Sequence, residues 1–113
     1  MHELSLAESM LQIIEDAAAE QGFTRVKKIW MEVGRLSCVE KDALRFGFSV
    51  VVDGTVAQQA VLEIIDIAGR GRCERCSSEI AVTTLYDACP NCGSYAIDII
   101  RGNEMRITEM EVE

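Results

Sequence analysis

The residues best suited to chemistry are four cysteines arranged in two pairs. Cys73 and Cys76 are separated by two residues, as are Cys89 and Cys92, and twelve residues lie between the pairs. Two intervening residues allow both sulfurs of a pair to reach one ion about 2.3 Å away, and two such pairs complete a closed tetrahedron. The spacing therefore predicts a structural zinc site with these four cysteines as ligands.

Two alternatives stay open for the cysteines. A Cys-x-x-Cys pair can exchange thiols and disulfides when a basic group lowers a thiol pKa, and Arg72 and Arg75 give that role weak support. A zinc ribbon can also be a bare interaction module, for which an acidic chain favours a protein partner. Cys38 stands apart and is expected to be a small apolar residue near a helix start. Gly93 is expected to adopt a positive φ in a tight turn.

The first three residues, Met1-His2-Glu3, form a second candidate metal site. The Met1 amine, the backbone nitrogen of His2 and its imidazole can close two adjacent chelate rings on one ion, and Glu3 can supply a fourth ligand. Nitrogen-rich, square-planar or tetragonal sites favour Ni²⁺ or Cu²⁺. His2 is the only histidine in the chain, so any imidazole site must use it. Glu40 could approach such an ion as an additional oxygen ligand.

Each of these residues also has a plain structural explanation. A histidine at a chain terminus is commonly solvated, and Glu3 in the first turn of a helix interacts favourably with the helix dipole. Glu40 fits a capping box, Ser37-Cys38-Val39-Glu40, at the start of a second helix. Taken without further information, these explanations are more economical than a metal site.

Composition argues against several classes of function. The 113 residues carry a formal net charge of −8, whereas nucleic-acid-binding surfaces are normally basic, so no nucleic-acid partner is expected. No segment approaches the roughly 20 apolar residues that cross a bilayer, and the N-terminal residues lack the pattern of a signal peptide. We therefore expect a cytoplasmic protein without membrane contact. One histidine and no phosphate-binding loop leave no catalytic constellation, so we expect no enzyme.

Hydrophobic periodicity predicts two helices and four strands around the cysteines. Helical spacing covers residues 4–21 and 37–52, and alternation or apolar content indicates strands over 24–36 and 60–68. The second helix should bury Ala43, Leu44, Gly47, Phe48 and Val51. Beyond Cys92, strands over 95–100 and 104–112 should form a hairpin with its turn at Gly102-Asn103.

These elements predict an α+β fold in which a small mixed sheet and two helices carry an inserted zinc-ribbon lobe. Gly69-Arg70-Gly71, just before the first cysteine pair, is the clearest internal boundary. We expect residues 1–68 and 97–113 to form one α+β domain and residues 69–96 the zinc-binding lobe. Exposed strand edges leave the oligomeric state open.

Three segments together resemble the HypA/HybF family of hydrogenase maturation proteins, which insert nickel. They are the opening Met1-His2-Glu3-Leu4-Ser5-Leu6, the segment 30–40 (WMEVGRLSCVE), and the two cysteine pairs with their twelve-residue spacing. The resemblance covers essentially the whole chain, and the order and spacing of the motifs agree with it.

The resemblance implies a nickel metallochaperone for the maturation of the nickel–iron hydrogenase large subunit. The family's N-terminal nickel site maps onto Met1, His2 and Glu3, and its associated acidic residue onto Glu40, where capping stays an equal explanation. The four lobe cysteines match the family's structural zinc ligands. Nickel would thus be cargo, zinc a structural cofactor, and residues 1–68 and 97–113 the nickel-binding domain.

The resemblance also implies partners. Family members work with the GTPase HypB and dock on the hydrogenase large-subunit precursor, and some also serve urease maturation. The zinc lobe, joined through Gly69 and Gly71, is a candidate for reporting nickel loading to such a partner.

Overall fold

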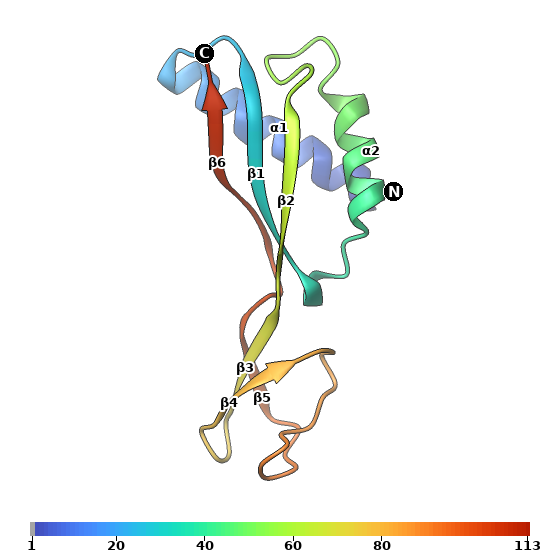
Figure 1. The fold of residues 1–113 in the computed structure, drawn as a ribbon, viewed down its shortest axis with the longest axis vertical. Helices are drawn as coiled ribbons and strands as arrows, with labels where there is room; N and C mark the ends of the chain where they lie inside the picture. The colour runs from blue at the N-terminus through green and yellow to red at the C-terminus, as the bar shows by residue number, and fades with distance from the viewer. Residues whose placement is uncertain (1) are drawn as a thin grey trace. The chain divides into compact units, whose positions relative to one another are not determined.

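The computed structural model describes residues 2–113, and Met1 lies outside the described residues. Its elements run in the order α1 (His2–Gln21), β1 (Val26–Gly34), a 3₁₀ helix η1 (Arg35–Ser37), α2 (Lys41–Val51), β2 (Val61–Ile67), β3 (Gly69–Cys73), β4 (Glu79–Val82), β5 (Ile97–Arg101) and β6 (Met105–Val112) (Figure 1). Helices and small sheets together confirm the predicted α+β class. The chain divides into two compact units, which we describe separately.

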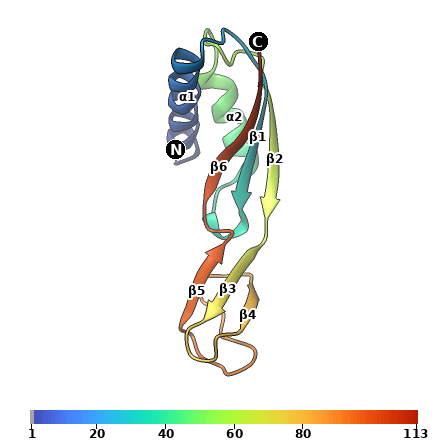
Figure 2. The ribbon, with the colours of Figure 1, turned by 90° about the vertical axis from the view of Figure 1, so that its left-hand side faces the viewer.

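Unit 1 comprises the residues up to Met31, Val39–Ile64 and Ile107–Glu113. Within it, α1 buries Ala7, Met10, Ile14 and Ala18 at helical spacing, as the apolar pattern predicts. Strand β1 buries Ile29 and Met31, which alternation puts on one face, and also buries Val26 at its start. In the sheet of order β2-β1-β6, β1 is the central strand. Both helices lie on one face of these strands (Figure 2), so unit 1 is a two-layer structure.

Helix α2 begins later than predicted, at Lys41 rather than near Ser37. Cys38 has φ 60° and ψ 25°, a left-handed conformation that cannot continue a right-handed helix. The Ser37 hydroxyl donates a hydrogen bond to the Gly34 carbonyl, 2.6 Å away, and does not cap α2. The predicted capping box is therefore wrong, and Glu40 itself is the N-cap residue.

The buried face of α2 also differs in part from its prediction. Leu44, Gly47 and Phe48 are buried as expected, whereas Ala43 is exposed and Val51 is only half-buried. Cys38, expected to be a small apolar residue near a helix start, is exposed. The apolar residues of α2 thus cover a wider part of the helix than the face that packs against the rest of unit 1.

Unit 2 comprises Glu32–Cys38 and Ile65–Arg106. Its sheet has the order β4-β3-β5, and β3 pairs antiparallel with both neighbours. The core is small and contains Leu36, Cys73, Ile80, Val82 and Cys89, with Ile97 and Ile99 packed against it. Two of the five buried members are thus cysteines, which indicates that this core depends on what the sulfurs bind.

The predicted hairpin of the last two strands is wrong. Strand β5 pairs with β3, whereas β6 pairs with β1 in the other sheet. Gly102 has a positive φ of 90°, as expected of a turn, but its carbonyl accepts the N–H of Leu36 at 2.8 Å. Gly34 approaches Gly102 so closely that a Cβ at Gly34 would lie 2.1 Å from the Gly102 oxygen. The turn residues therefore contact a distant segment of unit 2.

Candidate metal sites

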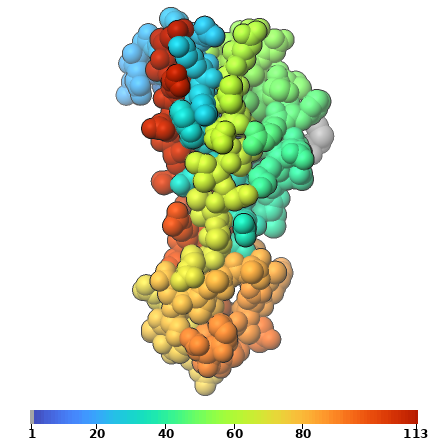
Figure 3. All heavy atoms as spheres, viewed as in Figure 1, coloured from blue at the N-terminus to red at the C-terminus, as the bar shows by residue number. Residues whose placement is uncertain are grey.

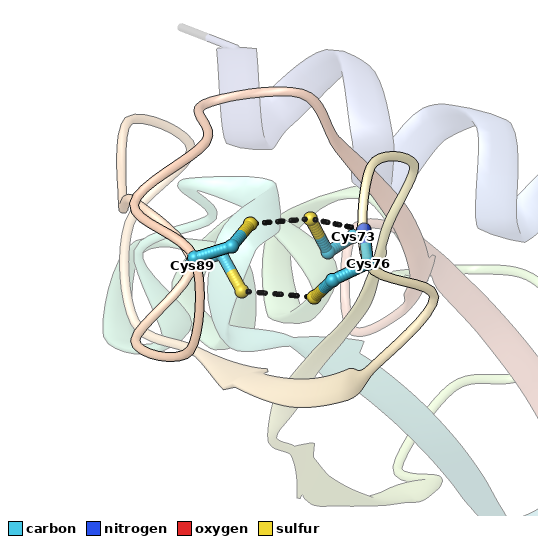
Figure 4. Close-up of side chains that lie close together, drawn as sticks. Cys73, Cys76 and Cys89 are labelled. Carbon is cyan, nitrogen blue, oxygen red and sulfur yellow. Dashed lines mark hydrogen bonds between the residues drawn. The ribbon is translucent and has the colours of Figure 1, made fainter.

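The four cysteines of the two pairs converge in unit 2. Their sulfurs all lie within 4.8 Å of one another, with 3.5 Å between the Sγ atoms of Cys73 and Cys92 and 3.7 Å between those of Cys76 and Cys89. Figure 4 shows Cys73, Cys76 and Cys89 with their sulfurs gathered in one place. Tetrahedral ligands 2.3 Å from a zinc ion lie about 3.8 Å apart. The cluster therefore fits a closed, four-coordinate structural metal site.

Each cysteine pair is held by the same backbone turn. In the first turn the N–H of Ser77 donates to the Cys73 carbonyl at 2.8 Å, and the N–H of Cys73 donates to the Ser78 carbonyl at 2.9 Å. In the second, the corresponding bonds, of Gly93 to Cys89 and of Cys89 to Ser94, are both 2.8 Å. Ser77 and Gly93 occupy equivalent positions, with φ values of 63° and 76°. The positive φ predicted for Gly93 is confirmed.

Hydrogen bonds from the neighbouring thiols oppose the ionisation of Cys92 within the cluster. The pKa of Cys76 is lowered to about 6, first because the Ser78 hydroxyl, 3.3 Å away, stabilises the thiolate, with a backbone contribution from the same serine. The backbone N–H of Cys76 lowers the pKa of Cys73. The pKa of Cys92 is instead raised to about 11: the Ser94 N–H favours its thiolate, but the bond shared with Cys73 and burial outweigh that effect. A divalent cation would remove this conflict because metal-bound thiols are deprotonated.

A loop between the two cysteine pairs is fixed by a residue that the sequence patterns did not single out. The Asp87 carboxylate accepts the backbone N–H of Thr83 at 2.8 Å and the Thr84 hydroxyl at 2.7 Å. The same bonds, first that from the Thr83 backbone, hold the pKa of Asp87 well below its usual range. Threonine and aspartate are common in turns, but Leu85 and Tyr86 separate Thr84 from Asp87, so the sequence carries no specific signal for these bonds. This turn orders the chain on its way to the buried Cys89.

The residues of the second candidate site lie in unit 1, at the N-termini of its two helices. His2, the first residue of α1, is exposed, and Glu3 follows in the first turn. The Glu3 carboxylate accepts the backbone N–H of Glu40 at 3.3 Å, and this bond is the first cause of the lowered pKa of Glu3. The Glu40 carboxylate accepts the N–H groups of Asp42 and Ala43 at 3.3 and 3.1 Å. Glu3 and Glu40 are thereby brought together, while the predicted ligand Met1 lies outside the described residues.

Gly47 allows the two helices to approach at this point. A Cβ at Gly47 would meet the Leu4 Cα at 3.4 Å and the Glu3 carbonyl oxygen at 3.5 Å. Because a larger side chain would push α1 away from α2, Gly47 sets the position of Glu3 relative to Glu40. The sequence predicted only that Gly47 is buried in a helix. Periodicity could not predict its contact with the start of α1.

A two-layer α+β unit and a unit built around four converging cysteines define a small protein with a candidate metal site. Comparison with known proteins identifies the family to which it belongs. The model of the HypA family, described as hydrogenase/urease nickel incorporation, metallochaperone, matches residues 1–112. The chain therefore belongs to the HypA family of hydrogenase maturation factors and nickel metallochaperones, which are not enzymes.

Individual relatives and solved structures agree with this assignment. The hydrogenase maturation factors HypA of Azotobacter chroococcum mcd 1 and Dechloromonas aromatica are 47% and 48% identical to this chain, each over the full length of both proteins. The solution structure of the Ni metallochaperone HypA from Helicobacter pylori matches with a TM-score of 0.75 at 25% identity, covering 97% of this chain and 96% of that one. Among residues 2–113, no helix is long and apolar enough to cross a membrane.

Proposed function

We propose that this chain is a nickel metallochaperone that binds Ni(II) through Met1, His2 and Glu3, with Glu40 as an additional ligand. It then delivers the metal for maturation of the nickel–iron hydrogenase large subunit, and the family description extends the proposal to urease. The observation that carries the proposal is the bond between the Glu3 carboxylate and the Glu40 backbone beside His2. It ties the first turn of α1, which contains the only histidine of the chain, to Glu40.

The helix start supports nitrogen ligation. The first four N–H groups of a helix have no intrahelical acceptor, so Ni(II) can replace the proton of the His2 backbone N–H, which is released to solvent, without breaking a helical hydrogen bond. A helix N-terminus carries about half a positive charge, which disfavours a cation. The two carboxylates more than offset it, which is a physical reason for acidic residues at both helix starts.

For the cysteine cluster we propose Zn(II) in a structural role, with Cys73, Cys76, Cys89 and Cys92 as ligands. The near-tetrahedral sulfur spacing and the burial of Cys73 and Cys89 support zinc over thiol–disulfide exchange. Zinc supplies the charge that lets all four thiolates coexist. The division into a nickel-binding domain, residues 1–68 and 97–113, and a zinc-binding lobe, residues 69–96, stays part of this proposal.

Membership of a hydrogenase maturation family implies partners in that process. We propose the HypB GTPase and the large-subunit precursor, in the cytoplasm, with no nucleic acid and no membrane as partner. Urease accessory proteins are further candidates. The formal net charge of −8 supports protein or cation partners over phosphate backbones.

A nickel titration of zinc-loaded protein tests the site. The native start is compared with a copy that carries two extra residues before Met1, which keeps every side chain and converts the Met1 amine into an amide. We expect nickel binding at micromolar or tighter affinity in the native copy and its collapse in the extended copy. Equal binding by both copies would place nickel elsewhere, and absence of binding in both would favour a zinc-ribbon adaptor without cargo.

A further inference from the structure

A cleft of about 420 Å³ lies in unit 1 where α2 ends and β2 begins. Its lining comes from α2, from residues 52–60 and from the start of β2. In Figure 3, α2 and the segment that follows it, in green, form part of the molecular surface. Ligand sites usually enclose about 300–1,000 Å³ and combine apolar walls with a few converging polar groups. The cleft therefore has the size of a small-molecule site, and its residues define the chemistry of the ligand.

The buried part of the cleft is apolar. Phe48, Val52 and Leu62 line it and are 3%, 5% and 8% exposed. Leu62 belongs to β2, so this apolar surface joins the helix to the sheet. The polar side chains that line the cleft are instead exposed: Arg45, Ser49, Asp53, Gln58 and Gln59. A ligand with one apolar side chain can bury it on the first group while its polar atoms meet the second.

Arg45 carries a positive charge, and its structural role uses only one of its donors. Its Nη1 donates to the Leu62 carbonyl at 2.6 Å, which holds the guanidinium at the cleft. Among residues 2–113 Arg45 forms no ion pair. A guanidinium has five N–H donors, so several are left for a ligand. Such a planar set of donors binds a carboxylate through paired hydrogen bonds.

Asp53 supplies the opposite charge at the end of the same helix. It follows the C-cap residue Val52, and a helix C-terminus carries about half a negative charge, which favours a cation. Within the part of the chain that the structure describes, Asp53 likewise forms no ion pair. Because Arg45 and Asp53 line one cleft without neutralising each other, they can bind the two ends of a ligand that has a carboxylate and an ammonium group.

Two carboxamides complete the lining of the cleft. The Gln58 Oε1 accepts the Gly54 N–H at 3.1 Å, so the NH₂ group of Gln58 is left to donate. Gln59 has a φ of 67°, which is uncommon for a residue other than glycine. Strained backbone of this kind clusters at ligand sites. Since a carboxamide both donates and accepts, the two glutamines complement a peptide group, which has one N–H and one carbonyl.

We propose that this cleft binds a dipeptide with an apolar side chain. The carboxylate of the dipeptide pairs with Arg45, its ammonium group pairs with Asp53, and its side chain packs on the buried apolar surface. A ligand without net charge suits unit 1, whose twelve acidic and five basic side chains give a formal charge of −7 and would repel an anionic metabolite. Glu40 lies at the other end of α2. The cleft is therefore separate from the proposed nickel ligands, and the inference does not rest on the proposed function.

The test is an NMR titration of the full-length, zinc-loaded protein, without nickel, with three probes. They are glycyl-leucine, its N-acetyl derivative, which has no ammonium group, and its C-terminal amide, which has no carboxylate. We expect glycyl-leucine to bind at millimolar or tighter affinity and to shift the amide signals of residues 45–62. Each blocked probe should bind about fivefold more weakly, the loss expected for one partly exposed ion pair.

Variants assign each end of the ligand to its residue. Asp53→Asn should bind glycyl-leucine and its N-acetyl derivative equally, and Arg45→Gln should bind glycyl-leucine and its amide equally. Asp42→Asn is the matched control, because Asp42 is an exposed acid of α2 that does not line the cleft, and it should keep the native preference. Asp53→Asn decides the result even if Arg45→Gln does not fold. The proposal is overturned if the native protein binds none of the probes, binds all three equally, shows shifts outside residues 45–62 only, or keeps its preference in Asp53→Asn.

Discussion

The Glu3 carboxylate accepts the backbone N–H of Glu40 at 3.3 Å, although 37 positions separate the two residues. The bond ties the first turn of α1 to the N-cap of α2. At the same point the Glu40 side chain accepts two N–H groups of its own helix. Two acids that would repel each other are thus each satisfied by backbone donors, which leaves their remaining lone pairs available to a cation.

Replacing Glu40 with asparagine should separate capping from metal binding. Asparagine is among the best N-cap residues, so the stability of Glu40→Asn should stay close to that of the native protein. It has no carboxylate, so nickel affinity should fall about tenfold, equivalent to about 1.4 kcal/mol. Nickel titration and thermal unfolding measure the two effects. Glu40→Ala is the control, because it loses the cap as well, at a cost of about 1 kcal/mol. Native nickel affinity in Glu40→Asn would mean that Glu40 is only a cap.

The bond between Glu3 and Glu40 also predicts a pH dependence of stability. Because the folded-state pKa of Glu3 is lowered from its ordinary value of 4.5, its carboxylate stabilises the fold above that pH. This stabilisation is lost as the pH falls through the lowered folded value. The difference in unfolding midpoint between the native protein and Glu3→Gln should therefore be constant near neutrality and shrink in acid. If the difference in unfolding midpoint did not change with pH, the bond between Glu3 and Glu40 would not contribute to stability in this way.

Much of this arrangement could be predicted from the sequence because its signals are local. Cysteine spacing predicted a cluster that forms as expected, and the apolar period of α1 predicted its buried face. The errors fell where a distant segment competes with a local signal. Gly102 has the backbone of a turn, yet its carbonyl bonds to Leu36 instead of closing a hairpin.

The start of α2 shows the same limit. Ser37 to Glu40 has the sequence of a capping box, but Ser37 bonds to Gly34 and the left-handed Cys38 interrupts the helix. Nor does any local pattern indicate that Glu3 meets Glu40, because that contact depends on the packing of α1 against α2 at Gly47.

Metal removal should affect unit 2 selectively. Cys73 and Cys89 are two of its five buried core residues, so chelation or Cys73→Ser leaves buried thiols unpaired in a small core. Amides of β3 and β4 should lose their protection from hydrogen exchange, while the helical circular dichroism of unit 1 is retained. Cys38→Ser is the control, since Cys38 is exposed and lies outside the cluster. Loss of the helices together with β3 and β4 would show that the two units unfold as one.

Side-chain size at Gly47 should control both stability and nickel affinity. An alanine Cβ would meet Leu4 at 3.4 Å, an ordinary contact, and alanine is favoured over glycine in a helix by about 0.5–1 kcal/mol. Gly47→Ala should therefore be neutral or stabilising. Gly47→Leu overfills the helix contact, at a cost of about 1–3 kcal/mol, and should weaken nickel binding by displacing Glu3. Chemical denaturation measures the change in stability, and nickel titration measures the change in affinity. Native nickel affinity in a folded Gly47→Leu protein would show that nickel binding does not depend on the distance between the two helices.

The two cysteine turns should respond in opposite ways to exchange of their left-handed residues. Gly93→Ser puts a side chain at φ 76°, which costs about 1–2 kcal/mol, and should lower zinc affinity in chelator competition. Ser77→Gly relieves the same strain at φ 63°, but glycine also adds about 0.5–1 kcal/mol of chain entropy to the unfolded state. Its zinc affinity should therefore stay near the native value or rise. Since both turns have the same backbone hydrogen bonds, a large loss in Ser77→Gly would mean that the serine side chain, and not its backbone conformation, supports the metal site.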